Sequence, residues 1–300
     1  MNTKDIQKDI SCPICQSKDL IVRYENVSGN KTLLACRTCS VWFLHPFPDE
    51  EERKEIYKEE YFGFWGYSPE GAESVRVLKK HLYGKILREI EQYAKLYRIL
   101  DIGCAMGYSL EAAKEKGIKP YGVEISEFAG KIAQERFGDD VKIGDIRDVD
   151  FKDTSFDAVT MIDLLEHVEE PVSILKKVND VLKKNGTLAI LVPDLSSCSS
   201  KILGRNWTHV TKVAQHLFLF SPKSIKLILA STGFRTEAIK PFRKPMTPLY
   251  AKNVLSCGNF RFLYYVVNMI CAVLPEKLKT TSFDLPTGEM LVIAKKIKNA

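Results

Sequence analysis

The sequence lacks several features that would assign it to a class of protein at once. It contains no run of about 20 apolar residues, the length that a membrane-spanning helix needs. Its first ten residues, MNTKDIQKDI, carry charges where a signal peptide is apolar. The formal charge of +6 is modest, and no dense stripe of lysine and arginine interleaved with aromatic residues is present. We therefore expect a cytoplasmic protein, for which nucleic acid is not excluded as a partner but is not indicated.

Two glycine motifs of nucleotide-binding proteins, G-x-x-x-x-G-K-[ST] and G-x-G-x-x-G, are also missing. The stretch that stands nearest to them is RILDIGCAMGYSLEAAKEKG, in which an apolar run reaches Asp101 and is followed by Gly103, Gly107 and a helical pattern. A carboxylate just before the first glycine would repel a pyrophosphate but suits an ammonium group and hydroxyls. The loop therefore favours a ligand that carries an amine over a dinucleotide.

Four of the eight cysteines lie in the first forty residues, in the pairs CPIC and CRTC. Two C-x-x-C pairs separated by 20 residues, with β-prone segments and a turn between them, are typical of a ribbon that binds zinc through four thiolates. A redox pair or two disulfides are the alternatives, which a reducing cytoplasm disfavours. We predict a closed, structural zinc site in a ribbon over residues 1–45. Its ligands are Cys12, Cys15, Cys36 and Cys39.

From residue 98 onward, β-prone and helical segments alternate, which predicts an α/β fold with a doubly wound, mostly parallel sheet. Ligands of such sheets bind beyond the carboxyl ends of the strands. Three acidic residues, Asp101, Glu124 and Asp145, occupy three successive strand ends. Together they indicate a nucleoside ligand with a cationic, amine-bearing tail.

The segments LDIGCAMG, YGVEIS, GDIRD, FDAVTMIDLLEHV and VLKKNGTLAILVPD occur in this order, and residues 98–297 thereby resemble the class I S-adenosylmethionine (SAM)-dependent methyltransferases. The resemblance implies a seven-stranded Rossmann-like sheet with an antiparallel last strand, EMLVIAKKI. It also implies that Asp101 lies at the methionine part of SAM, Glu124 at the ribose and Asp145 at the adenine amine. The cofactor-binding residues that it implies are Asp101, Gly103, Cys104, Gly107, Glu124, Ile125, Asp145, Ile146 and Asp163.

The ribbon followed by LHPFPDEEERKEIYKEEYF resembles a group of bacterial methyltransferases, some of which act on nucleotide-linked sugars. By that resemblance, residues 46–97 form a helical connector over the cofactor. Tyr57, Tyr61 and Phe62 then belong to a lid, or else they are core aromatic residues between two domains. A group of ribosomal-RNA guanine methyltransferases also carries such a ribbon, so RNA stays an alternative acceptor.

The methyl acceptor is less well defined. The [N/D]-P-P-[Y/F] segment of enzymes that methylate the amino groups of bases is absent, and MIDLLEHV stands in its place. In that segment Asp163, Glu166 and His167 resemble the E-x-x-E-H group with which ubiquinone-pathway and small-RNA methyltransferases bind magnesium or manganese. Aspartate replaces the first glutamate here, and helix capping and packing are the alternative explanation. Magnesium is thus a second candidate metal.

The 29 residues from 193 to 221 exceed an ordinary connection and lie on the ligand side of the sheet. They contain His209 and His216, which together with His167 are the candidate general bases, because histidine takes up a proton near neutral pH. A structural role for these histidines is the alternative.

A helical insertion is expected at about 241–288, inside a methyltransferase domain of residues 98–300. Its apolar part, 254–275, suits either a buried cap helix or an interfacial helix in peripheral contact with the inner face of the membrane. The basic residues that flank it are Arg243, Lys244, Lys277 and Lys279.

The sequence as a whole predicts SAM-dependent methyl transfer to a small or amphipathic acceptor, such as a glycan precursor, a lipid or a quinone intermediate. RNA methylation is an alternative enzymatic function. A zinc-ribbon binding module without turnover is the non-enzymatic alternative.

Overall fold

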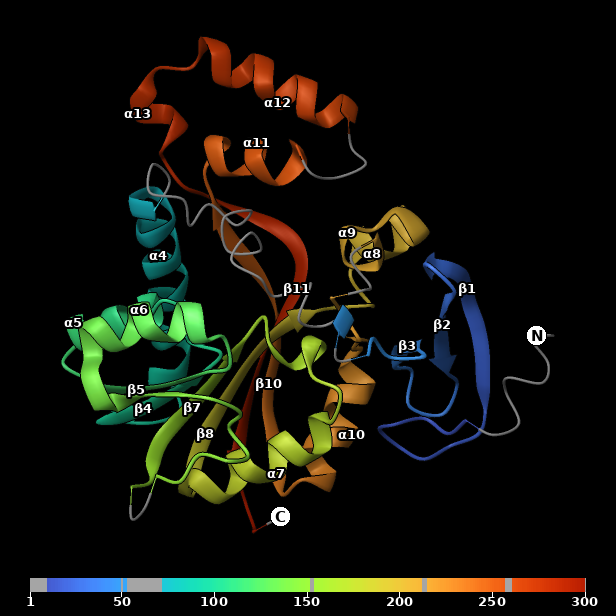
Figure 1. Ribbon diagram of the computed structural model, residues 1–300, viewed down its shortest axis with the longest axis vertical. Helices are drawn as coiled ribbons and strands as arrows, with labels where there is room; N and C mark the ends of the chain where they lie inside the picture. The colour runs from blue at the N-terminus through green and yellow to red at the C-terminus, as the bar shows by residue number, and fades with distance from the viewer. Residues whose placement is uncertain are drawn as a thin grey trace.

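The structure is a computed structural model, and it describes residues 10–49, 51–52, 72–151, 154–211, 215–256 and 261–299. The chain forms a seven-stranded sheet with helices on both faces and a smaller four-stranded sheet near the N-terminus (Figure 1). The lid candidates Tyr57, Tyr61 and Phe62 lie outside the described residues.

The strands of the large sheet are β4 (Arg98–Ile102), β5 (Lys119–Glu124), β6 (Val141–Ile143), β7 (Phe156–Ile162), β8 (Leu182–Pro193), β10 (Phe234–Met246) and β11 (Phe283–Lys296). Their spatial order is β10-β11-β8-β7-β4-β5-β6. β4 to β8 pair in parallel, whereas β11 is antiparallel to both of its neighbours. This arrangement confirms the predicted doubly wound, mostly parallel seven-stranded sheet and its antiparallel last strand.

Among the residues that the structure describes, five helices pack on this sheet: α4 (Ala72–Glu91), α5 (Tyr108–Glu115), α6 (Glu127–Phe137), α7 (Pro171–Val181) and α10 (Pro222–Ser231). The apolar run FDAVTMI makes β7 a strand that is buried on both faces. Ala158 and Ile162 join the core formed with α4 and α5, whereas Val159 and Met161 join the core formed with α7 and α10. The carboxyl ends of the central strands are therefore held rigidly from both sides.

The small sheet consists of β1 (Leu20–Ser28), β2 (Lys31–Cys36), β3 (Trp42–His45) and β9 (Phe218–Leu219). β1 and β2 form a hairpin that turns at Gly29, whose φ of +57° favours glycine. β9 comes from the long segment after β8 and pairs with β3, Phe43 opposite Phe218. Cys12, Phe43 and Phe218 belong to the same hydrophobic core as β7 and β8. The N-terminal ribbon, residues 10–45, is thus packed into the α/β domain and is completed by one of its strands.

Three helices connect β10 to β11: α11 (Pro248–Ser256), α12 (Arg261–Val273) and α13 (Glu276–Lys279). Because β10 extends to Met246 and β11 begins at Phe283, this helical segment spans 247–282 and is shorter than the expected 241–288. In Figure 1 it stands beyond the end of the sheet, with α12 outermost. Among the described residues, no helix combines the length and the apolar character needed to cross a bilayer.

Candidate functional site

The loop after β4 is shaped by two glycines with left-handed backbones. Gly103 has φ +77° and Gly107 has φ +80°. A Cβ atom would lie 3.2 Å from Cδ1 of Leu164 at the first position and 3.0 Å from Cε2 of Phe137 at the second. The backbone conformation and the close approach both disfavour a side chain. The amide of Gly103 donates to the carbonyl oxygen of Val123 at 2.8 Å, so the loop lies against the end of β5.

Asp101 lies beneath this loop and is only 2% exposed. Its carboxylate accepts hydrogen bonds from the hydroxyls of Thr160, at 2.6 Å, and Ser109. Burial raises the pKa of Asp101 to about 6, although the two hydroxyls act in the opposite direction. Asp101 therefore joins β4 to β7 and α5, and its charge lies directly under the loop.

Glu124, the last residue of β5, joins three loops. One of its carboxylate oxygens accepts a hydrogen bond from the amide of Ala105, and the other accepts one from Ser126, both at 2.8 Å. The amide of Gly144, after β6, donates to the carbonyl oxygen of Glu124 at 2.9 Å. Burial raises the pKa of Glu124, against the effect of the hydrogen bonds from Ser126 and Ala105. The loops after β4, β5 and β6 thus meet at one edge of the sheet, here called the cofactor edge.

Asp145, the third acidic residue of the cofactor edge, is held by Arg147. Nη2 of Arg147 donates to Oδ2 of Asp145 at 2.7 Å, and the amide of Arg147 donates to Oδ1 at 2.8 Å. This pairing lowers the pKa of Asp145, although partial burial opposes it. Arg147 was not among the predicted site residues; its position two residues after Asp145 in GDIRD was the available signal.

The other apolar and sulfur side chains predicted at the cofactor edge differ in exposure. Ile125 is 68% exposed and leaves an apolar surface beside Glu124. Cys104 and Ile146 are buried. A Cβ atom on Gly122 would lie 2.6 Å from Sγ of Cys104, so this thiol packs onto β5 in the core. Only the backbone of Cys104 and Ile146 remains for a ligand.

A second group of charges, here called the charged cluster, consists of Asp163, Lys244 and Glu289. Nζ of Lys244 donates to both carboxylate oxygens of Asp163 at 2.8 Å and to Oε1 of Glu289 at 2.6 Å. Burial alone would lower the pKa of Lys244, but the two carboxylates raise it above its ordinary value. Asp163 has a left-handed backbone with φ +53°, which is uncommon for a residue with a side chain. The ammonium group thus joins β10 and β11 to the end of β7.

The three predicted histidines lie next to the charged cluster and form the histidine group. His209 lies in α9 (Thr208–Thr211), and its Nε2 is 4.0 Å from Oε1 of Glu289. His209 stacks on His216 with ring centroids 5.1 Å apart, and His216 meets His167 edge to face at 4.8 Å. Nδ1 of His167 is 2.8 Å from the carbonyl oxygen of Gln215; because a carbonyl only accepts, Nδ1 carries the proton.

The predicted metal group of Asp163, Glu166 and His167 does not form, because Lys244 occupies both oxygens of Asp163. The structure instead brings Glu166, His167 and His216 together, with ligating atoms within 4.8 Å of one another. One carboxylate and two imidazoles suit zinc, manganese or iron better than magnesium, which prefers oxygen ligands. Burial and the neighbouring Asp163 raise the pKa of Glu166 well above its ordinary value, which disfavours the carboxylate form that a metal ion would need.

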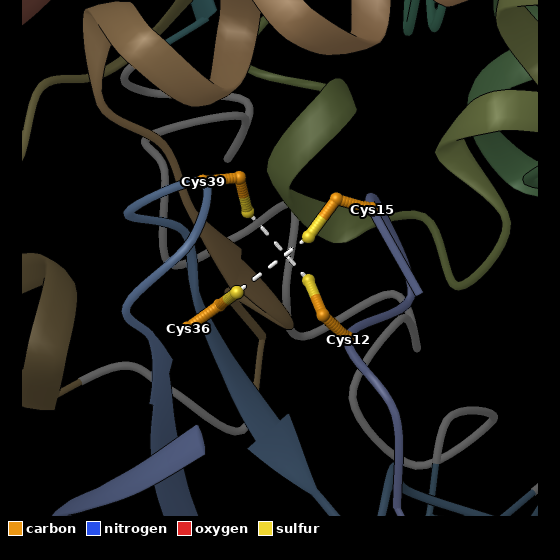
Figure 2. A group of neighbouring side chains, drawn as sticks. All are labelled: Cys12, Cys15, Cys36 and Cys39. Carbon is orange, nitrogen blue, oxygen red and sulfur yellow. Dashed lines mark hydrogen bonds between the residues drawn. The ribbon is translucent and has the colours of Figure 1, made fainter. Parts of the chain in front are cut away.

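The four cysteines of the ribbon converge on one point (Figure 2). Sγ of Cys12 is 3.6 Å from Sγ of Cys39, and Sγ of Cys15 is 3.6 Å from Sγ of Cys36. A disulfide would need about 2 Å, whereas four thiolates at about 2.3 Å from one zinc ion lie just under 4 Å apart. Each C-x-x-C pair lies in a tight turn. The amide of Gln16 donates to the carbonyl oxygen of Cys12 in the first turn, and the amide of Ser40 donates to that of Cys36 in the second. The donor set and its spacing therefore fit the predicted zinc ion.

The family described as "Methyltransferase domain" matches residues 57–239, which is more than half of the chain. This range contains the cofactor edge, Asp163 and the histidine group, and it excludes the four cysteines, Lys244 and Glu289. The fold and the site define a SAM-dependent methyltransferase. The chain belongs to this family of methyltransferase domains.

Relatives agree with this assignment. The chain is 26% identical to an O-methyltransferase of Aspergillus nomiae over 187 residues. The aligned part is 58% of this chain and 79% of the relative. It is 28% identical over 132 residues to a ubiquinone biosynthesis O-methyltransferase of Idiomarina loihiensis, 42% of this chain and 51% of the relative. A putative sarcosine dimethylglycine methyltransferase of Galdieria sulphuraria superposes with a TM-score of 0.51 at 15% identity, over 83% and 98% of the two chains, and shows the shared fold.

Proposed function

We propose that the chain transfers the methyl group of SAM to an oxygen atom of a small or amphipathic acceptor, such as a glycan precursor, a lipid or a quinone intermediate. The observation that carries the proposal is the position of the charged cluster and the histidine group beside the cofactor edge. Leu164, the residue after Asp163, lies against the Gly103 turn of the cofactor loop. Methyl donor and acceptor would therefore meet between these two groups.

The cofactor edge suits SAM in both charge and shape. Asp101 places a carboxylate beneath the loop, where it would attract the ammonium group of the methionine part. Glu124 fixes the loop and ends β5, the position at which such sheets bind ribose hydroxyls. Ile125 offers an apolar surface that a bound adenine ring would cover. When bound, SAM supplies the methyl group, and the chain supplies the alignment.

Transfer to a hydroxyl also needs a base, because the oxygen loses its proton as it gains the methyl group. We assign this role to His209, whose side chain keeps 16% exposure, more than that of His167 at 11%. The proton would pass from the acceptor hydroxyl to the imidazole. Glu289, 4.0 Å away, would stabilise the resulting positive charge, and Lys244 opposes the effect of burial, which raises the pKa of Glu289.

We further propose that the ribbon binds one structural zinc ion through Cys12, Cys15, Cys36 and Cys39. The convergence of the four sulfur atoms supports this assignment. Four protein ligands leave no open position for a substrate, so the ion would stabilise the ribbon and take no part in methyl transfer.

The test uses the purified full-length chain, SAM with a radioactive methyl group, and a solvent extract of bacterial membranes as the acceptor pool. Label should enter the extract with the wild type and fall by at least about a hundredfold with His209→Gln, because a positioned base contributes about 100-fold or more. The matched control is His81→Gln, on α4, whose ring contacts Ser282 outside the histidine group. Equal transfer by His209→Gln and the wild type would contradict the role of His209, and no transfer to the extract or to nucleotide-linked sugars would contradict the acceptor class.

A further inference from the structure

The outer surface of α12 is apolar, which is the reverse of an ordinary surface helix. Tyr265 is 56% exposed, Met269 is 70% exposed and Val273 is 82% exposed. These side chains are four residues apart and therefore form one stripe along the helix. Cys271, on the opposite side, is buried toward the rest of the molecule. The outermost helix of Figure 1 thus presents its apolar stripe away from the protein.

Exposed apolar side chains continue beyond α12. Ile270 adjoins the stripe, Leu278 lies on α13, and Phe283 and Leu285 lie at the start of β11, all more than 40% exposed. Isolated exposed apolar residues are common on proteins, but so many within one short segment of the chain indicate a binding surface. We call the exposed residues of α12, α13 and the start of β11 the apolar cap.

Charge indicates what covers the apolar cap. Residues 247–285, which span the apolar cap, contain four basic residues and two acidic residues, so the segment is positive. The basic residues are Lys252, Arg261, Lys277 and Lys279, and the acidic residues are Glu276 and Asp284. A second copy of this chain would bring two positive segments together, whereas an anionic bilayer surface attracts them. Tyr265 is a residue type that favours the boundary between headgroups and acyl chains.

The dimensions of the helix indicate how it would lie. The 13 residues of α12 extend about 20 Å at 1.5 Å per residue, which is less than the hydrocarbon thickness of about 30 Å. A helix of this length with one apolar side lies in the plane of the interface. We propose that the apolar cap binds the surface of an anionic lipid bilayer, with α12 parallel to that surface.

The position of the cap connects this binding to the catalytic site. β10 is parallel to the central strands, so the chain enters the cap at the edge of the sheet where the strands β4 to β8 end. Lys244, two residues before the end of β10, and Glu289 in β11 belong to the charged cluster. This part of the inference rests on the proposed function: a bilayer beneath the cap would present a lipid-like acceptor to the charged cluster and the histidine group.

The test measures binding of the full-length chain to sucrose-loaded vesicles by co-sedimentation. Vesicles of phosphatidylcholine with phosphatidylglycerol should bind the wild type, and vesicles of phosphatidylcholine alone should bind it at least about tenfold less. The variant Met269→Gln with Val273→Gln should lose about tenfold or more in binding to the mixed vesicles. The matched control is Ile297→Gln, 51% exposed near the C-terminus at the opposite end of the molecule in Figure 1.

Titration of the same proteins with S-adenosylhomocysteine separates this result from the proposed function. Loss of vesicle binding with normal cofactor binding concerns the apolar cap alone, and loss of cofactor binding concerns the proposed function. If the double variant does not fold, the single variant Val273→Trp is used in its place. The fluorescence of the added tryptophan should shift to shorter wavelength when the mixed vesicles are present. Equal sedimentation of the double variant and the wild type would overturn the proposal. The proposal would also be overturned if light scattering showed that the wild type is a dimer and the double variant a monomer, because the apolar cap would then bind a second copy of the chain.

Discussion

The cofactor edge and the charged cluster lie side by side, yet they are assembled in opposite ways. At the cofactor edge, Glu124 reaches the amides of Ala105 and Ser126, and Asp145 pairs with Arg147 two residues later. In the charged cluster, Lys244 pairs with Asp163 across 81 positions of sequence and with Glu289 across 45. The first is therefore built mainly from successive strand ends, and the second depends on the whole sheet and its insertion. Changes to the chain should affect the two regions separately.

Among the changes that should affect the two regions differently, removal of zinc should have the largest effect. A structural zinc ion contributes on the order of 10 kcal/mol to a small ribbon, and β3 of the ribbon pairs with β9, which begins two residues after His216. Cys36→Ser should therefore unfold the ribbon and displace the histidine group, while the cofactor edge keeps its affinity for S-adenosylhomocysteine. Metal analysis, the titration curves of the histidine ring protons and calorimetry measure the three effects. A reductively purified sample without zinc, or unchanged histidine titrations in Cys36→Ser, would break the proposed link.

Lys244→Met should have the next largest effect. Glu289, which is buried, and Asp163, which is half-buried, would lose their shared ammonium group, and breaking such an ion pair costs up to about 3–5 kcal/mol of unfolding free energy. Methyl transfer should also fall, because Glu289 would no longer be held as a carboxylate, whereas cofactor affinity should stay within about twofold. Urea unfolding and calorimetry test this prediction.

The matched control for that variant is Lys240→Met, on the same strand, whose partner Glu89 is on α4. This ion pair is solvent-accessible, so its loss should leave stability and methyl transfer nearly unchanged. Equal destabilisation by the two lysine variants would show that the charged cluster has no special role.

Asp101→Asn should have a smaller effect on stability, in the opposite direction. Folding raises the pKa of Asp101 from 3.8 to about 6, so the folded state binds the proton more tightly. Stability therefore falls as pH rises from about 4 to 6, and above that range the charged carboxylate costs on the order of 3 kcal/mol. Asp101→Asn should unfold at higher urea concentration at pH 7, lose this pH dependence and bind S-adenosylhomocysteine more weakly. Lower stability of the variant at pH 7 would contradict the cost of burying this charge.

The sequence predicted the sheet, the cofactor edge and the four cysteines because each rests on neighbouring residues. Two C-x-x-C pairs and a β-hairpin are sufficient to bring four sulfur atoms together. The charged cluster was missed, since nothing near Lys244 in the sequence marks its partners. Lys244 was instead expected to flank the apolar segment 254–275, and its ion pairs with Asp163 and Glu289 correct that expectation. Asp163 was expected at the cofactor, and its contact with Lys244 likewise depends on β10 crossing the sheet to reach it.

His209 and His216 were identified by residue type and loop length, and His167 by the motif DLLEH, but the contacts among the three were not predicted. His209 and His216 stack because β9 pairs with the ribbon, which fixes the chain after His216. Such a strand, Phe218–Leu219, is too short to show a pattern in the sequence. Tertiary pairing of this kind is the part of the site that local patterns cannot specify.

The most direct test of the account is calorimetric titration of the wild type and Glu124→Ala with S-adenosylhomocysteine and with NAD. The wild type should bind S-adenosylhomocysteine and not NAD, because a carboxylate precedes the glycine loop where a pyrophosphate would lie. Glu124→Ala should weaken binding by about 1–3 kcal/mol, since the loop and the ligand lose a charged acceptor. Glu127→Ala, which removes an exposed partner of Lys131 on α6, should leave it unchanged. Tight binding of NAD, or equal affinity of Glu124→Ala and the wild type for S-adenosylhomocysteine, would contradict the assignment of this edge to SAM.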